Sequence, residues 1–329
     1  CVMTWSKIRN GDLQSPSQIL NDYSLQKFSL STQQNSLIEE HIGADCIEHE
    51  DQRAPMLTSD EFILGGAYTI QHQKENPFAG FVYGRLGVKK IEAFNKGLTP
   101  RVRGQFLHQA LFELLKNTKG QIDLSSWTLP EKSKRISDAL DKSIKLFDEH
   151  TDDSYKEILS LEKNRLFKVL LKYLDTELDR PSFIIKGLEK EVFYEKYGVK
   201  LKFRIDRIDQ LNNNELLIID YKSSSEDKRI LSKDRTVHDV QPFLYKDTQS
   251  VPVAGLLFIT LNSKKIAKRG AGYGWTKQQK LDDPEELISC SKEVDVIVKS
   301  FAKGDIRIPL FGQKESSKES RPLAILTRF

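Results

Sequence analysis

The segment between residues 199 and 222 limits the possible folds more than any other part of the chain. Apolar and polar side chains alternate along residues 199–210, and this two-residue period predicts a half-buried strand. Three consecutive asparagines, residues 212–214, predict a turn. The continuous apolar run at residues 216–219 is typical of a strand buried on both faces. A strand buried on both faces needs a layer of the protein on each side, so we expect this hairpin at the centre of a layered fold.

Helical patterns lie before and after this hairpin. Residues 103–117 and a longer block, residues 131–179, repeat apolar side chains at three- and four-residue spacing, as amphipathic helices do. A short strand at residues 192–194, a continuous apolar strand at 251–261 and a closing helix at 285–303 complete the pattern. We therefore predict an α/β (α+β) fold, with a mixed central sheet flanked by helices and a helical insertion.

The two ends of the chain are polar. We expect residues 1–62 to be an N-terminal arm or the remnant of a preceding domain, and residues 313–329 to be a polar tail. The folded domain is expected at residues 63–312, with the helical insertion at about 125–185 and the sheet at about 188–262. Because translation does not begin at cysteine, the chain is expected to be a fragment or a processed form.

Composition excludes several classes of protein. Hydrophobic residues make up 38% and charged residues 30% of the chain, which predicts a soluble globular protein. No stretch approaches the ~18 apolar residues of a membrane-spanning helix. The three cysteines, Cys1, Cys46 and Cys290, are far apart, so they support neither a disulfide framework nor a zinc ribbon, and they favour a reducing cytoplasm. A net charge of +4 permits a polyanionic partner without requiring one.

The hairpin also suggests a site. If Asn213 lies at the centre of a short loop, Asp206 pairs directly with Asp220 and Arg204 with Lys222, all on one face. Opposed side chains have Cβ atoms about 4.5–5.5 Å apart, and two opposed carboxylates repel unless something positive lies between them. A hard divalent cation meets that need. A bulge in the loop would shift this register.

The residue types in this pattern fit phosphodiester hydrolysis. Asp220 follows a buried strand, where a carboxylate is costly unless it is paired or binds a metal. The ammonium of Lys222 could hold an attacking water or stabilise charge developing on a phosphate. The alternative is that Asp206 and Asp220 are surface ion-pair partners of the nearby basic residues.

Residues 203–209 (Phe-Arg-Ile-Asp-Arg-Ile-Asp) and 218–223 (Ile-Ile-Asp-Tyr-Lys-Ser) resemble the core of RecB/AddB-type nucleases in the PD-(D/E)XK superfamily. Three further matches follow the family's order: Gly104-x-x-x-His108, the acidic Glu189, and Gln241-x-x-x-Tyr245. The lead-in also matches, at Gly65-Gly66, Gln73, Pro77-Phe78 and Arg85-Leu86. Each motif is short, and their common order makes the resemblance specific.

The resemblance implies a restriction-endonuclease-like fold and a Mg²⁺-dependent deoxyribonuclease in which Mn²⁺ can substitute. It makes Asp206 and Asp220 metal ligands that take part in catalysis, and Lys222 the catalytic lysine. His108 becomes an additional metal ligand or a positioning group, with a core-edge histidine as the alternative. Gly104, one turn before His108, is expected to let that helix approach the sheet closely.

The remaining matched residues have less defined roles. The resemblance implies that Glu189 helps to hold the metal, and Glu191 is a competing assignment. Gln241 and Tyr245 share one helical face, where they could contact DNA or orient the site, or belong to an ordinary amphipathic helix. Arg204 is also expected to contact DNA.

The chain departs from the family pattern at three points. Phe203 stands where the family often has glycine. Many AddB-type members have an iron–sulfur cluster, but here Asn76 precedes Pro77 and no cysteine cluster follows Cys290. We therefore expect no cluster. Because no Walker A motif is present, any helicase activity is expected in a partner subunit or in missing sequence.

We therefore expect a DNA exonuclease or single-strand nuclease acting in DNA repair or recombination. The basic stretch of Lys264, Lys265, Lys268 and Arg269 is expected to contact backbone phosphates, or else to be a solvated loop. The alternative functions are a non-catalytic DNA-binding or scaffolding module that retains the fold, and an enzyme acting on RNA or branched DNA.

Overall fold

The computed structural model describes residues 8–9, 12–13, 53–58, 61, 63–89, 97–147, 153–223, 229–272 and 284–307. The chain divides into two compact units, Cys1–His49 and Glu50–Phe329. In the first unit the described residues form a short antiparallel ladder of β1 (Ile8–Arg9) and β2 (Asp12–Leu13). Cys1, Cys46 and the expected tail lie outside the described residues. Every residue discussed below belongs to the second unit.

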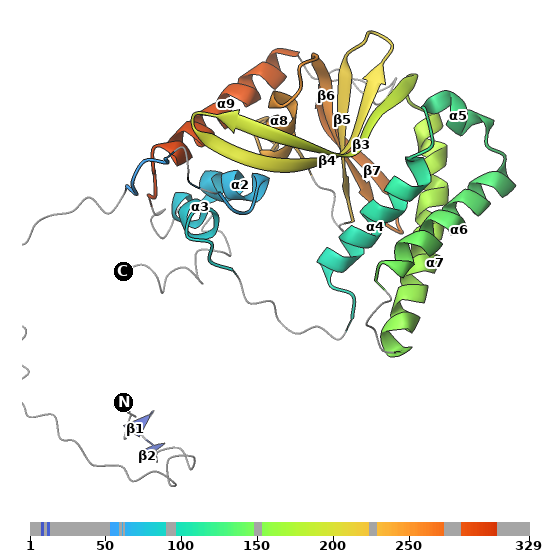
Figure 1. Cartoon of the computed structure of the whole chain (residues 1–329), viewed down its shortest axis with the longest axis horizontal. Coiled ribbons are helices and arrows are strands. Elements are labelled where there is room, and N and C mark those ends of the chain that lie inside the picture. The colour runs from blue at the N-terminus through green and yellow to red at the C-terminus, as the bar shows by residue number, and fades with distance from the viewer. Residues whose placement is uncertain are drawn as a thin grey trace, which may run out of the picture. The chain divides into compact units, whose positions relative to one another are not determined.

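A five-stranded mixed sheet forms the centre of the second unit (Figure 1). Its order is β3 (Phe183–Lys196), β4 (Val199–Leu211), β5 (Leu216–Lys222), β6 (Val253–Leu261) and β7 (Ile266–Gly272). Only the β5–β6 pair is parallel, and the other neighbours in this sheet are antiparallel. The predicted fold, a mixed central sheet with flanking helices, is confirmed.

Helices cover both faces of this sheet (Figure 1). One group comprises α2 (Ala67–Glu75), α3 (Pro77–Gly84), α8 (Gln241–Asp247) and α9 (Pro284–Ala302). The other comprises α4 (Pro100–Leu115), α5 (Gln121–Ser126), α6 (Leu129–Lys145) and α7 (Asp153–Leu178). Among the described residues, no helix has the length and apolar character that crossing a membrane requires.

The buried run in β5 explains this layering. Ile218 packs in the core that contains α2, α8 and α9, whereas Leu217 and Ile219 pack in the core that contains α4, α6 and α7. Because successive side chains of a strand point to opposite faces, one short run supplies both cores. The prediction of a strand buried on both faces is confirmed, and it places the end of β5 between the two helical layers.

Several element boundaries differ from the sequence-based expectation. Helix α4 begins at Pro100, earlier than expected, because Thr99 caps it by accepting from the Val102 amide and proline suits the first turn. Strand β3 is much longer than the expected three residues, and a bulge between Ile185 and Gly187 hides its two-residue period. Strand β7 was not predicted, since its charged side chains are those of an edge strand.

Candidate active site

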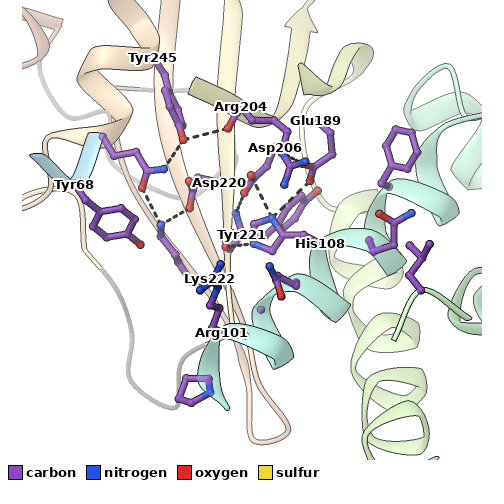
Figure 2. Close-up of a pocket in the computed structure, with 18 of the residues that line it drawn as sticks. Tyr68, Arg101, His108, Glu189, Arg204, Asp206, Asp220, Tyr221, Lys222 and Tyr245 are labelled. Atoms are coloured by element: carbon purple, nitrogen blue, oxygen red, sulfur yellow. Dashed lines mark hydrogen bonds and ion pairs between the residues drawn. The ribbon is translucent and has the colours of Figure 1, made fainter. Parts of the chain in front are cut away.

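One cleft of about 850 Å³ gathers the eight residues that the hairpin and the family resemblance placed at the site (Figure 2). The helices α4 and α8 and the strands β3, β4 and β5 each contribute to it. The eight residues are His108, Glu189, Arg204, Asp206, Asp220, Lys222, Gln241 and Tyr245. The first and the last of them, His108 and Tyr245, are more than 130 residues apart in the sequence. The tertiary fold therefore assembles the cleft.

The β4–β5 hairpin has the expected register only up to the edge of the site. Arg207 pairs with Ile219, as a loop centred on Asn213 requires, but the ladder ends there. The expected Asp206–Asp220 ladder pair is therefore not formed. Instead, Asp206 Oδ2 accepts a hydrogen bond of 2.7 Å from the Tyr221 amide. Asp206 thus faces the cleft while its carboxylate is fixed by the main chain of β5.

His108 on α4 lies against two of the acidic residues. Its Nδ1 is 3.2 Å from Asp206 Oδ1 and 3.6 Å from Glu189 Oε1. Its Nε2 lies 3.0 Å from the carbonyl oxygen of Tyr221, and because a carbonyl only accepts, Nε2 donates. A neutral imidazole in this tautomer has a lone pair on Nδ1. The lone pair points toward the carboxylates of Asp206 and Glu189, so that all three side chains could bind one cation.

Gly104 does not have the role expected for it. A Cβ atom at this position would lie 3.7 Å from Ser223 Oγ, which is ordinary contact distance. The approach of α4 to the sheet therefore does not require glycine here.

The carboxylates of the cleft repel one another and are partly buried. Burial, together with the nearby charge of Asp206, raises the pKa of Asp220 to about 7. Burial alone would lower the pKa of His108, but hydrogen bonds to Asp206 and Glu189 outweigh it and raise that pKa to about 10. The cleft therefore concentrates negative charge that a nearby positive group stabilises.

These donors fit a divalent cation. His108, Glu189 and Asp206 each offer one ligand atom, and the three atoms lie within 4.8 Å of one another. Asp220 Oδ2 is buried. Lys222 Nζ lies 2.7 Å away from it but does not form a well-aligned hydrogen bond with it. Donors of this kind suit a hard divalent cation, which His108, Glu189 and Asp206 would hold, with Asp220 lining the same cleft.

The structure favours Glu189 over Glu191 as the upstream acidic residue. Glu189 lies beside His108 and is bridged by Arg204 Nε at 2.8 Å, with 17% of its side chain exposed. Glu191 is 60% exposed and pairs with Lys202. Glu189 also has a φ of 47°, a conformation that costs of order 1–3 kcal/mol in a non-glycine residue. This strained backbone directs its carboxylate to the cleft.

Exchanging each glutamate for glutamine gives a matched test of this assignment. Glu189→Gln is expected to weaken Mn²⁺ binding by at least about tenfold, since it removes a negative oxygen ligand. Glu191→Gln, two residues further along the same strand, is expected to leave the affinity unchanged. Titration calorimetry with Mn²⁺ measures both, and equal affinities of the two variants would contradict the assignment.

Gln241 and Tyr245 hold Lys222. Lys222 Nζ lies 2.7 Å from Asp220 Oδ2 and 3.1 Å from Gln241 Oε1. Gln241 Nε2 is hydrogen-bonded to the Tyr245 hydroxyl, which donates to the carbonyl of Arg204 at 3.2 Å. Tyr245 is only 3% exposed and supports Gln241, which in turn orients the lysine. A contact of Gln241 or Tyr245 with DNA stays a prediction.

Arg204 does not face Lys222 as expected. Its guanidinium pairs with Glu189, and 65% of its side chain is exposed in the cleft. Among the further exposed side chains of the cleft, which the sequence did not indicate, are Tyr68 on α2 and Arg101 on α4. No sequence signal identified them, because only the packing of α2 and α4 beside β5 brings them there.

Lys268, one residue of the basic stretch at residues 264–269, has a structural role. Its Nζ donates to the carbonyl of Thr176 at 2.9 Å and lies 4.0 Å from Glu177 Oε1. Burial lowers the pKa of Lys268. Its ammonium is directed at the end of α7, and a contact of the basic stretch with DNA phosphates stays a prediction.

At the end of the central strand β5, Asp220 and Lys222 share one cleft with the carboxylates of Asp206 and Glu189. Residues 70–288 match the family model of the PD-(D/E)XK nuclease superfamily. The chain belongs to this superfamily, whose members use divalent metals.

Several solved structures resemble this chain, and two of them illustrate the similarity. The first is described as a "putative exonuclease" from Eubacterium rectale; it is 11% identical with a TM-score of 0.44, over 80% of this chain and 88% of that one. The second is SSO0001, which is 16% identical with a TM-score of 0.23, over 58% of this chain and 84% of that one. No curated protein matches this sequence.

Proposed function

We propose that this protein is a RecB/AddB-type, Mg²⁺-dependent deoxyribonuclease, acting as an exonuclease or single-strand nuclease in DNA repair or recombination. The observation that carries the proposal is the meeting of Asp220 and Lys222 with His108, Glu189 and Asp206 in one cleft. The ordered family motifs support the RecB/AddB subfamily. We also propose residues 63–312 as the nuclease domain, preceded by an arm and followed by a polar tail.

In this proposal, His108, Glu189, Asp206 and Asp220 hold the metal. A bound divalent cation supplies Lewis-acid polarisation of the scissile phosphate. The Tyr221 main chain keeps Asp206 and His108 in place through its amide and its carbonyl. A metal held by these four side chains would determine where the scissile phosphate is bound.

Lys222 is proposed as the catalytic lysine. Asp220 and Gln241 hold its ammonium on two sides, which fixes the direction of its remaining N–H. Burial would lower the pKa of Lys222, but Asp220 outweighs that effect and raises it, so the side chain stays charged. A fixed positive charge at this position can stabilise the negative charge that develops on the phosphate oxygens.

DNA is the proposed substrate. The exposed guanidinium of Arg204 and the side chain of Arg101 lie in the cleft and suit a phosphate backbone. Tyr68, 66% exposed at the same cleft, offers a ring on which a base can stack. These contacts fit a strand whose bases are accessible.

Metal removal tests the proposal. Labelled single- and double-stranded DNA is incubated with the protein in Mg²⁺ or Mn²⁺, with EDTA, and with EDTA followed by excess Mg²⁺. Cleavage is expected with either metal, and we expect it to stop in EDTA and to return when Mg²⁺ is added back. End-labelled products distinguish exonuclease from endonuclease action.

Lys222→Ala is the matched protein control in this assay. It is expected to lose cleavage while it still binds DNA in a gel-shift experiment. Cleavage that persists in EDTA, or that is equal in Lys222→Ala, would overturn the catalytic assignment. DNA binding by the unmodified protein without cleavage under any condition would instead support a scaffolding module.

A further inference from the structure

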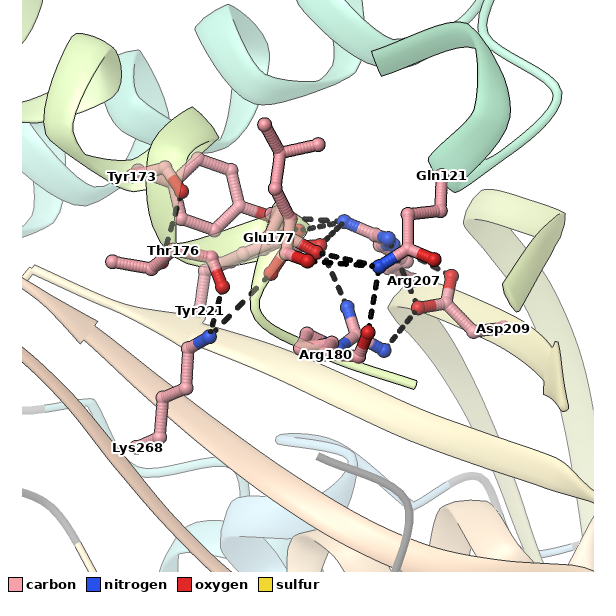
Figure 3. A network of polar contacts seen from close by, with 10 residues as sticks. Gln121, Tyr173, Thr176, Glu177, Arg180, Arg207, Asp209, Tyr221 and Lys268 are labelled. Atoms are coloured by element: carbon pink, nitrogen blue, oxygen red, sulfur yellow. Dashed lines mark hydrogen bonds and ion pairs between the residues drawn. The ribbon is translucent and has the colours of Figure 1, made fainter. Parts of the chain in front are cut away.

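A buried polar network lies behind the cleft, in the core between the sheet and α7 (Figure 3). We call it the Arg207 network, and it consists of Tyr173, Glu177, Arg180, Arg207, Asp209 and Tyr221. The side chains of Arg180, Arg207, Glu177 and Asp209 are completely buried. Burying so many charges is costly unless each is paired and hydrogen-bonded. The network therefore calls for a functional explanation.

Arg207 is the centre of this network. Its Nε and Nη2 donate to the two oxygens of Asp209 at 2.7 and 2.9 Å. Its Nη1 donates to the hydroxyls of Tyr173 and Tyr221 at 2.8 and 3.1 Å, and lies 2.9 Å from Glu177 Oε2. A planar guanidinium with its donors engaged in this way has one orientation.

The network attaches the helical insertion to the sheet. Arg180, just after α7, bridges Glu177 at 2.6 Å and Asp209 at 2.7 Å. Gln121 on α5 donates to the carbonyl of Arg180 at 2.6 Å. The end of α7 and the strand β4 are thereby held in a fixed relation, and Tyr173 is carried on that helix.

Tyr221 connects the network to the cleft. Its hydroxyl is hydrogen-bonded to the Tyr173 hydroxyl at 2.6 Å. Its amide donates to Asp206 at 2.7 Å, and its carbonyl accepts from His108 at 3.0 Å. The network therefore fixes the side chain of Tyr221, while its main chain holds Asp206 and His108, two proposed metal ligands.

We propose that Tyr173 and Arg207 are positioning residues for the metal site. They act through Tyr221, whose side chain they hold, and its main chain in turn orients Asp206 and His108. This inference rests on the proposed function, because it takes those residues to be metal ligands. Outer-shell groups of this kind typically change metal affinity 10–100-fold when they are lost.

Removing a single hydroxyl tests the proposal with little change in packing. Tyr173→Phe is expected to weaken Mn²⁺ binding about tenfold, measured as free Mn²⁺ by electron paramagnetic resonance on the full chain. Tyr194→Phe is the matched control: Tyr194, on β3, is buried as Tyr173 is, but its hydroxyl has no hydrogen-bond partner among the described residues. Its Mn²⁺ affinity is expected to equal that of the unmodified protein.

A double variant shows whether the two tyrosines act together. Tyr221→Phe alone is expected to weaken Mn²⁺ binding as Tyr173→Phe does. The double variant is expected to lose less than the sum of the two single losses, because the hydrogen bond between the two hydroxyls is common to both. Thermal unfolding is recorded for each variant, so that a loss of stability is separated from a loss of cation binding.

The outcomes distinguish this inference from the proposed function. If the unmodified protein binds no Mn²⁺, the proposed metal site fails and the inference fails with it. If the unmodified protein binds Mn²⁺ and Tyr173→Phe binds it equally well, with only a lower unfolding temperature, the positioning role alone is overturned. Additive losses in the double variant would also overturn it.

Discussion

Asp220→Asn is expected to reduce the rate of DNA cleavage by about 10²–10³-fold, the scale for losing one group that stabilises charge in a transition state. The carboxylate is 3% exposed and lies beside Lys222. An amide keeps the shape of the side chain but provides no negative charge for the cation or for Lys222. The effect is expected in the rate at saturating metal, not only in metal affinity.

The same substitution is not expected to destabilise the fold. Burial and Asp206 raise the pKa of Asp220, which means that its charge is unfavourable in the absence of a cation. Removing that charge therefore relieves a repulsion. A carboxylate that is needed for activity is expected to have such a cost in stability.

Single-turnover cleavage of labelled DNA measures this prediction. Asp175→Asn is the control, because Asp175 is exposed and pairs only with Lys132 among the described ion pairs; it is expected to cleave at the unmodified rate. Asp220→Asn with undiminished cleavage would contradict the role of Asp220 in catalysis. A variant that fails to fold would contradict the expectation that its charge is unfavourable in the fold.

Arg207→Met is expected to lower the free energy of unfolding by about 3–5 kcal/mol, the typical cost of removing one partner from a buried ion pair. Methionine keeps much of the volume. However, Asp209 then retains only Arg180 as its cation among the contacts described, and the two tyrosine hydroxyls lose a shared donor. A fall in melting temperature on the order of 10 °C follows from this loss.

Thermal unfolding by circular dichroism measures this effect without any metal or DNA. Arg135→Met is the control, since Arg135 is exposed on α6 and lies over the Trp127 ring; a change within about 0.5 kcal/mol is expected for such a surface site. Equal melting temperatures for the two variants would show that the Arg207 network is not a structural requirement.

The sequence predicted those parts of the site that depend on local pattern. The buried run before Asp220, the turn near Asn213 and the two-residue period of β4 follow from side-chain alternation, and the hairpin has the predicted register up to Arg207. Alternation does not show where a ladder ends. The pairing of Arg204 with Lys222 was therefore wrong, because β4 leaves β5 at the point where Asp206 takes the Tyr221 amide.

Other features of the site were not predictable, because the sequence does not show whether a polar side chain lies in a loop or in the core. Lys268 looked like a phosphate contact, yet it lies against the end of α7. Tyr245 looked like a DNA contact, yet it is buried and holds Gln241. Their partners, Thr176 and Arg204, lie more than 40 residues away, beyond the reach of any local pattern.

By itself, the sequence determined the central hairpin, the layered fold and the identity of the chemical groups, because these depend on periodicity and residue type. The tertiary structure alone decided how those groups are arranged. It placed His108 and Glu189 beside Asp206, chose Glu189 over Glu191, and put the Arg207 network behind the site. The physical reason is that a buried charge needs a partner at hydrogen-bond distance, and the packing of distant segments determines which partner it meets.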